Sequence, residues 1–452
     1  MKIVVVGCGK IGTTFVSHLI SEGHDVVAIE SDTSVIAQLN NIYDVMTVTG
    51  NGVDSDTLFE AGVDSAELFI ATTGSDELNM LSCYLAKRMG AKQTVARIRN
   101  PEYNDNSLSF MKANLDISMV INPDLLAAQE LYNILKLPSA AKVNFFSHRN
   151  FEIVEIKLKP DSILDGTTLA DFRKKHNVDV LFCAVQRDEN VYIPNGNFTL
   201  KSGDKVAIAA TKGEMLKFVK MTDAIRRKAK DVMILGASRT AYYLSNMLIG
   251  SGSSVKIVEI DRKKCEEFSE SVPEATVICG DGAHQELLME EGIRSTDAFV
   301  SLTGMDEENI LVSMFASSQN VPTVITKINR KEFLATAERL GLETVITPKK
   351  IVCDRIVQYA RALHNSLGSN VETLYNLMDG SVEALEFNVG TDCKLVETPL
   401  KDLKLKENVL IAGIIRGRKI IIPSGNDSIH FGDRVIIVAE GSRYSDLSDI
   451  AQ

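Results

Sequence analysis

The sequence predicts an α/β protein made of two tandem modules, each a doubly wound parallel sheet followed by a small α+β domain. Short apolar runs alternate with segments of helical spacing, which is typical of a parallel sheet covered by helices. The order of motifs then repeats at an offset of about 230 residues. A chain of 452 residues is also too long for a single hydrophobic core.

Composition excludes several classes of protein. The net charge of −11 argues against nucleic acid as the main partner. No apolar stretch approaches the roughly 20 residues that span a bilayer, and the first residues read as a strand without a signal peptide. The seven cysteines are scattered, without a C-x-x-C pair. We therefore expect a reduced, cytoplasmic protein that does not itself insert into the membrane.

The first twelve residues carry the strongest local motif. An apolar strand is expected over Ile3 to Val6, and a helix over Thr13 to Ile20. Between them Gly7, Gly9 and Gly12 form G-x-G-x-x-G, which permits a tight turn, close approach of a pyrophosphate, and close helix–strand packing. The helix N-terminus adds free N–H groups for phosphates. This part is predicted to be Rossmann-like, and its candidate cofactor-binding residues are Gly7, Cys8, Gly9, Lys10, Ile11 and Gly12.

The second expected strand, His24 to Glu30, ends on an acid. Glu30 lies 18 residues after Gly12, about where a dinucleotide fold places the carboxylate that binds the adenosine ribose. The following Ser31, Asp32 and Thr33 include no Arg or Lys for a 2′-phosphate. The sequence thus favours NAD(H) or an adenosine phosphate over NADP, the alternative being that Glu30 is a helix N-terminal acid.

The remaining elements of the first domain follow in order. Strands are expected over 45–48, 68–71, 94–98 and 117–120, and helices over 36–39, 57–61, 78–89 and 125–137. Asn51 stands in a Gly-Asn-Gly turn, and a polar cluster from Thr72 to Asn79 follows the fourth strand. Strand ends of this kind form the ligand crevice of open parallel sheets, so we attribute the cluster to a ligand. Arg97 could pair with phosphate or form a surface salt bridge.

From Val143 to Met221 the pattern changes to short strands and turns, interrupted by one helix near Thr168 to His176. No catalytic-looking cluster occurs there. The predicted domains are 1–140 (nucleotide-binding), 141–222 (α+β), 223–230 (linker), 231–365 (nucleotide-binding) and 366–452 (α+β).

The repeat indicates duplication of a two-part module. The matching positions are Gly236 on Gly7, Glu259 on Glu30, Asp281 on Asn51, Thr303 to Asn309 on Thr73 to Asn79, Lys327 on Arg97, and Gly432-Asp433 on Gly203-Asp204.

The second glycine loop, Gly236 to Ala241, keeps only its first glycine. Ser238 places a Cβ where the backbone should approach phosphate. Two interpretations remain open: this loop binds a nucleotide in an altered pose with help from Arg239, or it is empty and structural.

Together these motifs resemble RCK/KTN regulatory modules, and two in tandem are similar to the cytosolic regulatory subunits of Trk potassium uptake systems. The resemblance implies a homo-oligomeric ring that docks at the inner face of the cell membrane on a TrkH-like potassium-conducting subunit. It implies regulation by NAD(H), ATP or ADP, with phosphates at Gly7, Gly9 and Gly12. It further implies ribose at Glu30 and adenine near Asn51. The residues that would line the clefts are Thr72, Thr73 and Arg97, and by position Gly236, Ser238, Arg239, Glu259, Asp281 and Lys327 in the second module.

Two other function classes, an NAD-dependent dehydrogenase and a soluble ligand sensor, remain as alternatives. An NAD-dependent dehydrogenase needs a proton donor or acceptor beside the nicotinamide, but the seven histidines make no recognisable pair. A soluble sensor could hold another ligand, such as a cyclic dinucleotide, in the strand-rich domain, yet nothing in 143–221 marks such a site. The acidic residues near the clefts lack the spacing of a multi-carboxylate loop, so no metal site and no catalytic residue are predicted.

Overall fold

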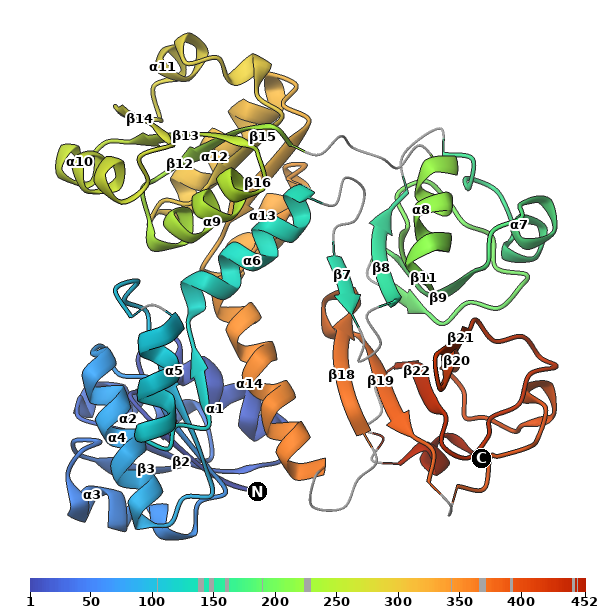
Figure 1. The fold of residues 1–452 in the computed structure, drawn as a ribbon, viewed down its shortest axis with the longest axis horizontal. Helices are drawn as coiled ribbons and strands as arrows, with labels where there is room; N and C mark the ends of the chain where they lie inside the picture. Colours follow the sequence, from blue (N-terminus) through green and yellow to red (C-terminus); the bar gives the residue numbers. More distant parts are fainter. Residues whose placement is uncertain are drawn as a thin grey trace. The chain divides into compact units, whose positions relative to one another are not determined.

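The computed structural model describes residues 1–452 except 104, 137–141, 146–149, 159–161, 189, 223–228, 343, 366–370, 391–392, 441–443 and 445. It divides into two compact units, Met1–Tyr132 with Ala229–Ala360, and Asn133–Lys228 with Arg361–Gln452 (Figure 1). The predicted domain boundaries at 140–141, 222–223 and 365–366 include a residue outside the described ones, as does the predicted linker 223–230, of which 223–228 are not described. The predicted boundary at 230–231 coincides with the start of the strand Asp231–Leu235. Within the described part of the chain, no helix is both long and apolar enough to cross a membrane.

The first unit opens with the predicted six-stranded parallel sheet, in the order β3-β2-β1-β4-β5-β6. Its strands are β1 (Lys2–Val6), β2 (Asp25–Glu30), β3 (Met46–Thr49), β4 (Leu68–Ala71), β5 (Gln93–Arg97) and β6 (Met119–Ile121). Its helices are α1 (Gly12–Ser21), α2 (Thr33–Ile42), α3 (Ser55–Glu60), α4 (Asp76–Met89), α5 (Asp105–Asn114) and α6 (Pro123–Lys136). The strand order reverses between β1 and β4, which creates the crevice where such sheets bind ligands. Helix α5 was not predicted, because its Asn- and Ser-containing segment has no strong helix-forming run.

The second sheet repeats the first, in the order β14-β13-β12-β15-β16-β17. Its strands are β12 (Asp231–Leu235), β13 (Ser254–Glu259), β14 (Thr276–Cys279), β15 (Ala298–Ser301), β16 (Thr323–Lys327) and β17 (Val345–Ile346). Its helices are α9 (Arg239–Gly250), α10 (Arg262–Ser271), α11 (Gln285–Glu290), α12 (Asp306–Ser318), α13 (Leu334–Arg339) and α14 (Pro348–Asn365). Strand register extends the equivalence, because Arg97 pairs with Ile121 and Lys327 pairs with Ile346. The predicted duplication is confirmed.

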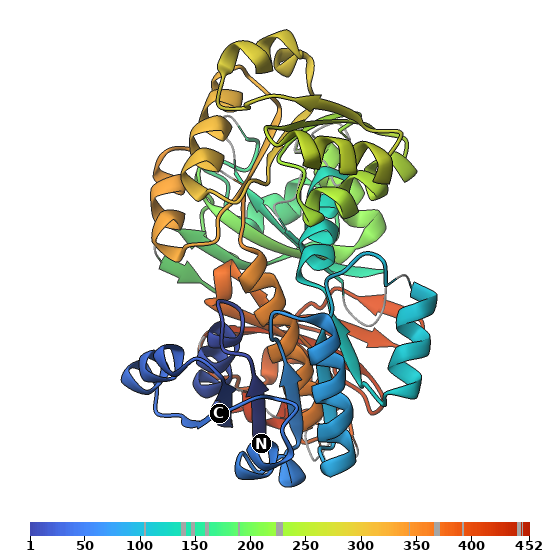
Figure 2. The same cartoon turned by 90° about the vertical axis from the view of Figure 1, so that its left-hand side faces the viewer.

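The last helix of each parallel-sheet domain packs against the other domain. At the start of α6, the Asn122 side-chain amide donates a hydrogen bond to the Tyr243 hydroxyl of α9, at 3.0 Å. Late in α14, the Tyr359 hydroxyl donates to the Gln93 side chain of β5, at 3.3 Å. Figures 1 and 2 both show α14 beside the first domain. Each domain therefore completes the surface of the other.

The second unit contains two five-stranded antiparallel sheets, in the orders β10-β9-β11-β8-β7 and β18-β19-β22-β20-β21. The strands are β7 (Lys142–Phe145), β8 (Phe151–Lys157), β9 (Val180–Arg187), β10 (Asn190–Tyr192), β11 (Lys205–Thr211), β18 (Val371–Leu377), β19 (Val382–Asn388), β20 (Val409–Arg416), β21 (Lys419–Ile421) and β22 (Arg434–Glu440). The helices are α7 (Leu169–Lys175) and α8 (Lys212–Met221), of which the sequence analysis missed α8. The two sheets share one apolar core, to which Phe151, Ile153, Leu377 and Ala384 belong.

The Gly-Asp motif of each strand-rich domain forms an ion pair in which the carboxylate is buried and the guanidinium is partly exposed. Asp204 is 1% exposed and accepts two hydrogen bonds from Arg187, at 2.7 Å each, and one from the Lys201 backbone at 2.8 Å. Arg416 and Asp433 repeat this arrangement in the second copy, at 2.9 and 2.8 Å. A two-pronged Arg–carboxylate pair of this kind fixes the turn before β11 and before β22. The motif is therefore structural.

Candidate functional site

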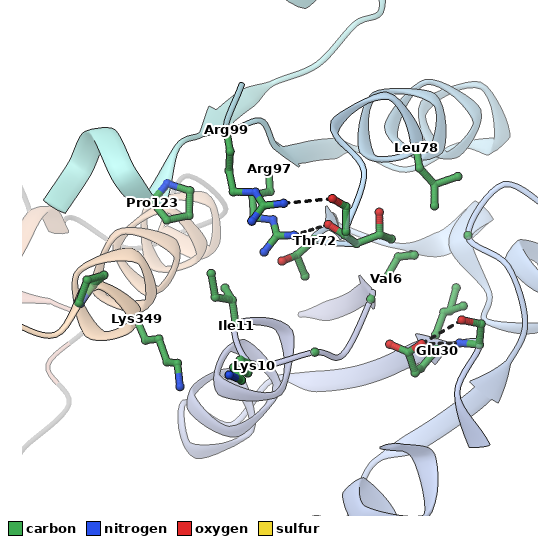
Figure 3. Close-up of a pocket in the computed structure, with 18 of the residues that line it drawn as sticks. Val6, Lys10, Ile11, Glu30, Thr72, Leu78, Arg97, Arg99, Pro123 and Lys349 are labelled. Carbon is green, nitrogen blue, oxygen red and sulfur yellow. Dashed lines mark hydrogen bonds between the residues drawn. The ribbon is translucent and has the colours of Figure 1, made fainter. Parts of the chain in front are cut away.

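A cavity of about 710 Å³ lies at the carboxyl ends of the first sheet, a size typical of small-molecule sites (Figure 3). The residues predicted for the first cleft that line it are Gly7, Gly9, Lys10, Ile11, Glu30, Asn51, Thr72, Thr73 and Arg97, whereas Cys8 and Gly12 do not. Of the residues predicted for the second cleft, Lys327 lines this first cavity, and Gly236, Ser238, Arg239, Glu259 and Asp281 do not. Further lining residues that were not predicted are Arg99, Asp124, Thr240, Asn329 and Lys349. A signal existed for Arg99, because it follows the strand that carries Arg97.

The three glycines of the first loop have different environments. Gly7 has a φ of +83°, and a Cβ there would lie 2.7 Å from the Thr73 backbone nitrogen. A Cβ on Gly12 would lie 2.0 Å from the Gly7 carbonyl oxygen. A Cβ on Gly9, in contrast, would meet no atom within 4 Å. Gly7 and Gly12 thus maintain the turn and the helix packing, whereas Gly9 keeps open space beside the loop.

The N-terminus of α1 faces the cavity without a cap from its own chain. Ile11 is the N-cap residue, and among the described residues no side chain accepts a hydrogen bond there. Lys10 and Ile11 both line the cavity. The partial positive charge of the first helical turn is therefore available to an anion.

Glu30 is held by backbone donors of the loops around it. Its carboxylate accepts hydrogen bonds from the backbone N–H groups of Cys8 and Ser31, at 2.7 Å each, and of Asp32, at 3.1 Å. Burial raises the pKa of Glu30, but these backbone bonds outweigh it and leave the pKa below its usual value. The carboxylate is thus ionised at neutral pH and fixes the glycine loop against the end of β2, where it lines the cavity.

Part of the polar cluster after β4 serves the fold and not a ligand, which corrects the interpretation of this cluster as ligand-binding. The Asp76 carboxylate accepts hydrogen bonds from the backbone N–H groups of Arg99 and Asn100, at 2.8 Å each. The Asn79 side chain is fully buried and binds both the backbone N–H of Thr73, at 2.7 Å, and the carbonyl of Arg97, at 2.8 Å. These side chains join the ends of β4 and β5, and the members of the cluster that line the cavity are Thr72, Thr73, Gly74 and Leu78.

Asn79→Ala is expected to lower the free energy of unfolding by about 2–3 kcal/mol, because it removes the partners of half-buried backbone groups. Thermal or urea unfolding of the full chain measures the loss. Asn114→Ala is the matched control, since the exposed Asn114 side chain bonds only within its own helix. Equal stability of the two variants would contradict a structural role for Asn79.

Three buried polar atoms in the cavity wall have no hydrogen-bond partner among the described residues: Thr72 Oγ1, Arg97 Nε and Arg99 Nε. Arg97 is only 9% exposed, and burial, aided by the charge of Arg99, lowers its pKa to about 10. Both arginines also donate to carbonyls of the 73–74 turn. Buried donors without partners are costly, so this wall fits a ligand that carries hydrogen-bond acceptors and negative charge.

The second domain contributes positive charge to the same cavity. Burial lowers the pKa of Lys327, whose ammonium donates to the Thr303 carbonyl at 3.3 Å. Lys349, in the first turn of α14, extends toward the side of the cavity where Lys10 and Ile11 lie (Figure 3). The exchange of the last helices places Lys349 there, which explains why sequence spacing does not reveal it.

At the second glycine loop, the backbone donors are bonded to the chain itself. The Ser238 hydroxyl caps α9 by accepting from the Ala241 backbone N–H, at 3.3 Å. Glu259 accepts from the Ala237 backbone N–H, at 2.8 Å, which repeats the contact of Glu30. Asp281 accepts from the Ala283 backbone N–H at 2.9 Å and thus shapes its own turn.

Comparison with known proteins agrees with this architecture. The TrkA-N domain matches residues 3–123 and 232–348, and the TrkA-C domain matches residues 153–222 and 384–452. The chain belongs to the TrkA family. One member of this TrkA family, the Trk system potassium uptake protein TrkA homolog of Archaeoglobus fulgidus, is 31% identical over 452 residues and covers 100% of both chains. The Trk system potassium uptake protein TrkA of Haemophilus influenzae is 27% identical and covers 97% of this chain and 95% of its own.

Solved structures with the same fold share less sequence with this TrkA family member. The GsuK channel superimposes with a TM-score of 0.65 at 17% identity, over 97% of this chain and 76% of its own. The GsuK channel bound to NAD gives 0.64 at 15% identity, over the same shares of the two chains. At these identities the likeness establishes the fold alone.

Proposed function

We propose that this chain is a nucleotide-binding regulatory subunit that gates a TrkH-like potassium-conducting membrane protein. The observation that carries the proposal is the intact glycine-loop cavity, whose wall holds two arginines with unpartnered buried Nε atoms, within a tandem architecture matched end to end by Trk potassium uptake proteins. The same family membership supports a homo-oligomeric ring that associates peripherally with the inner face of the cell membrane through its partner.

The lining chemistry supports NAD(H) or ATP/ADP as the regulatory ligand. Phosphates would lie at Gly9 and the N-terminus of α1, with Arg97 and Arg99 supplying charge, and ribose hydroxyls would lie at Glu30. Such a ligand supplies concentrated negative charge. The protein supplies the N-terminus of α1, where no side chain of the described residues takes the place of the ligand.

The position of the cavity supports regulation. A ligand shifts a conformational equilibrium only when it binds one state more tightly than another. Here Lys327, Asn329 and Lys349 of the second domain line a cavity built mainly by the first. A bound nucleotide would therefore favour one arrangement of the two domains, with a coupling of about 1–3 kcal/mol per site.

The direct test combines binding with transport. Thermal unfolding is measured with NADH, NAD, ATP and ADP, because a ligand of the native state raises the melting temperature. The chain is then expressed with its candidate membrane partner, and potassium flux is measured with and without the active nucleotide. Absence of any membrane partner would refute the transport role. Steady turnover of nicotinamide absorbance at 340 nm with 2-hydroxy acids would instead identify an oxidoreductase.

Arg97→Gln is expected to weaken nucleotide binding by about 10- to 100-fold, since hydrogen bonds to charged groups contribute about 1.5–3 kcal/mol. Titration calorimetry measures this, and the salt dependence of binding should also decrease. Arg88→Gln is the matched control, because Arg88 lies exposed on α4 and pairs with Asp116 outside the cavity, at 3.2 Å. The same loss in both variants would exclude a specific phosphate contact.

A further inference from the structure

We propose that Asp124 acts as a built-in anion for the second glycine loop, and that each chain therefore binds one nucleotide, at the first loop. The position equivalent to Asp124 at the first loop holds Lys349. The proposal rests on the proposed function in taking a nucleotide as the ligand of the first loop. It resolves the two interpretations that the sequence left open for the second loop.

The equivalence of Asp124 and Lys349 follows from strand register. Ile121 pairs with Arg97 in the first sheet, and Ile346 pairs with Lys327 in the second. Three residues after each isoleucine stand Asp124 and Lys349, and each follows the proline that begins its helix, α6 or α14. The duplication therefore placed opposite charges at matching positions.

Asp124 contacts the second glycine loop directly. The Thr240 hydroxyl in the first turn of α9 donates a hydrogen bond to Asp124 Oδ1, at 3.0 Å. Burial lowers the pKa of both Arg97 and Lys327, and the charge of Asp124 opposes that effect on each of them. The carboxylate thus lies among cations at a helix N-terminus, which is the environment that a ligand phosphate would otherwise occupy.

The two loops differ consistently in how their donors are used. At the second loop, Ser238 caps α9 and Asp124 bonds to Thr240. At the first loop no side chain caps α1, and Ile11, equivalent to Thr240, has no hydroxyl to bond. Both side chains line the same cavity, but Asp124 bonds to the helix that follows the second loop, whereas Lys349 extends toward Lys10 and Ile11 of the first loop.

Lys349 gives the first part of the test. Titration calorimetry of the full chain with NADH and with ATP is expected to give one nucleotide per chain. Lys349→Gln should weaken binding about tenfold or more, whereas Lys350→Gln, the next residue along α14 and not part of the cavity wall, should not change it. Two nucleotides per chain, with the second lost in Glu259→Ala, would overturn the proposal, as would equal affinities of the two lysine variants.

Asp124 is tested without nucleotide, with inorganic phosphate as the probe. Gly9→Asp blocks the first loop, and Asp124→Asn or Asp124→Ala is added to it. Phosphate should raise the melting temperature of the double variants by about 2 °C or more beyond the rise that it gives in Gly9→Asp alone. The reason is that the cations around Thr240 have lost their carboxylate. The isosteric Asn variant preserves the packing of α6. An equal response to phosphate with and without Asp124 would overturn its role.

The two parts separate failure of this inference from failure of the proposed function. If the wild-type chain binds none of the nucleotides, the proposed function fails, and with it the role of Lys349. The phosphate comparison still decides whether Asp124 occupies the second loop as an anion.

Discussion

Gly9→Asp is expected to abolish most nucleotide binding while leaving the fold intact. A Cβ at this position meets no protein atom within 4 Å, so the substitution costs little in packing at that atom. Its carboxylate would lie in the open space beside the N-terminus of α1, where it would compete with ligand phosphate for the same donors. Titration calorimetry with NADH and ATP measures the loss, and an unchanged melting temperature without ligand shows that the chain still folds.

Ser238→Asp is the matched control at the second loop. Because Ser238 already caps its helix and Asp is an equally good N-cap residue, this variant should keep its nucleotide binding. Equal losses in Gly9→Asp and Ser238→Asp would show that the second loop is a working phosphate site.

Asp204→Ala is expected to destabilise the second unit by about 2–3 kcal/mol, because it removes the buried acceptor of the hydrogen bonds from Arg187 and from the Lys201 backbone. Asp433→Ala should behave in the same way, since Arg416 repeats the pair. For a unit of this size the loss corresponds to a fall in melting temperature of roughly 4–12 °C.

Circular dichroism during heating measures this fall. Glu266→Ala removes an exposed partner of Arg262 and should change stability by less than about 1 kcal/mol. If Asp204→Ala unfolded at the temperature of the Glu266→Ala control, the ion pair at the Gly-Asp turn would not stabilise the domain.

The parallel sheets were predictable because their strands are buried on both faces. The run Ile3 to Val6 is at most 2% exposed, and such continuous apolar runs bounded by glycine have few other interpretations. Because the module is duplicated, each element was predicted in both copies. The prediction of the fold therefore did not depend on a single weak motif. Helices α5 and α8 were missed because each is only 10 residues long. Helix α8 also follows directly on β11 in a region whose other elements are mostly strands.

The site was predictable only where a single domain builds it. The glycine loop, Glu30 and Arg97 follow from position along one sheet, and the structure brings them to one cavity. Asp76 and Asn79 were misread because a ligand contact and a backbone contact call for the same side-chain chemistry. Asp124 belongs to the first domain and bonds to Thr240 of the second, and Lys349 belongs to the second domain and lines the cavity of the first. No spacing within one domain predicts contacts of this kind.

The exchange of α6 and α14 has an evolutionary consequence because it occurs within a single polypeptide. In a symmetric dimer of identical chains, every substitution appears at both related positions, so an acid at one contact requires an acid at the other. Fusion of the two halves removes that constraint. One half could acquire Asp124 and the other Lys349. The two duplicated halves could then differ in function, with one glycine loop open to a ligand and the other supplied with an anion by the chain itself.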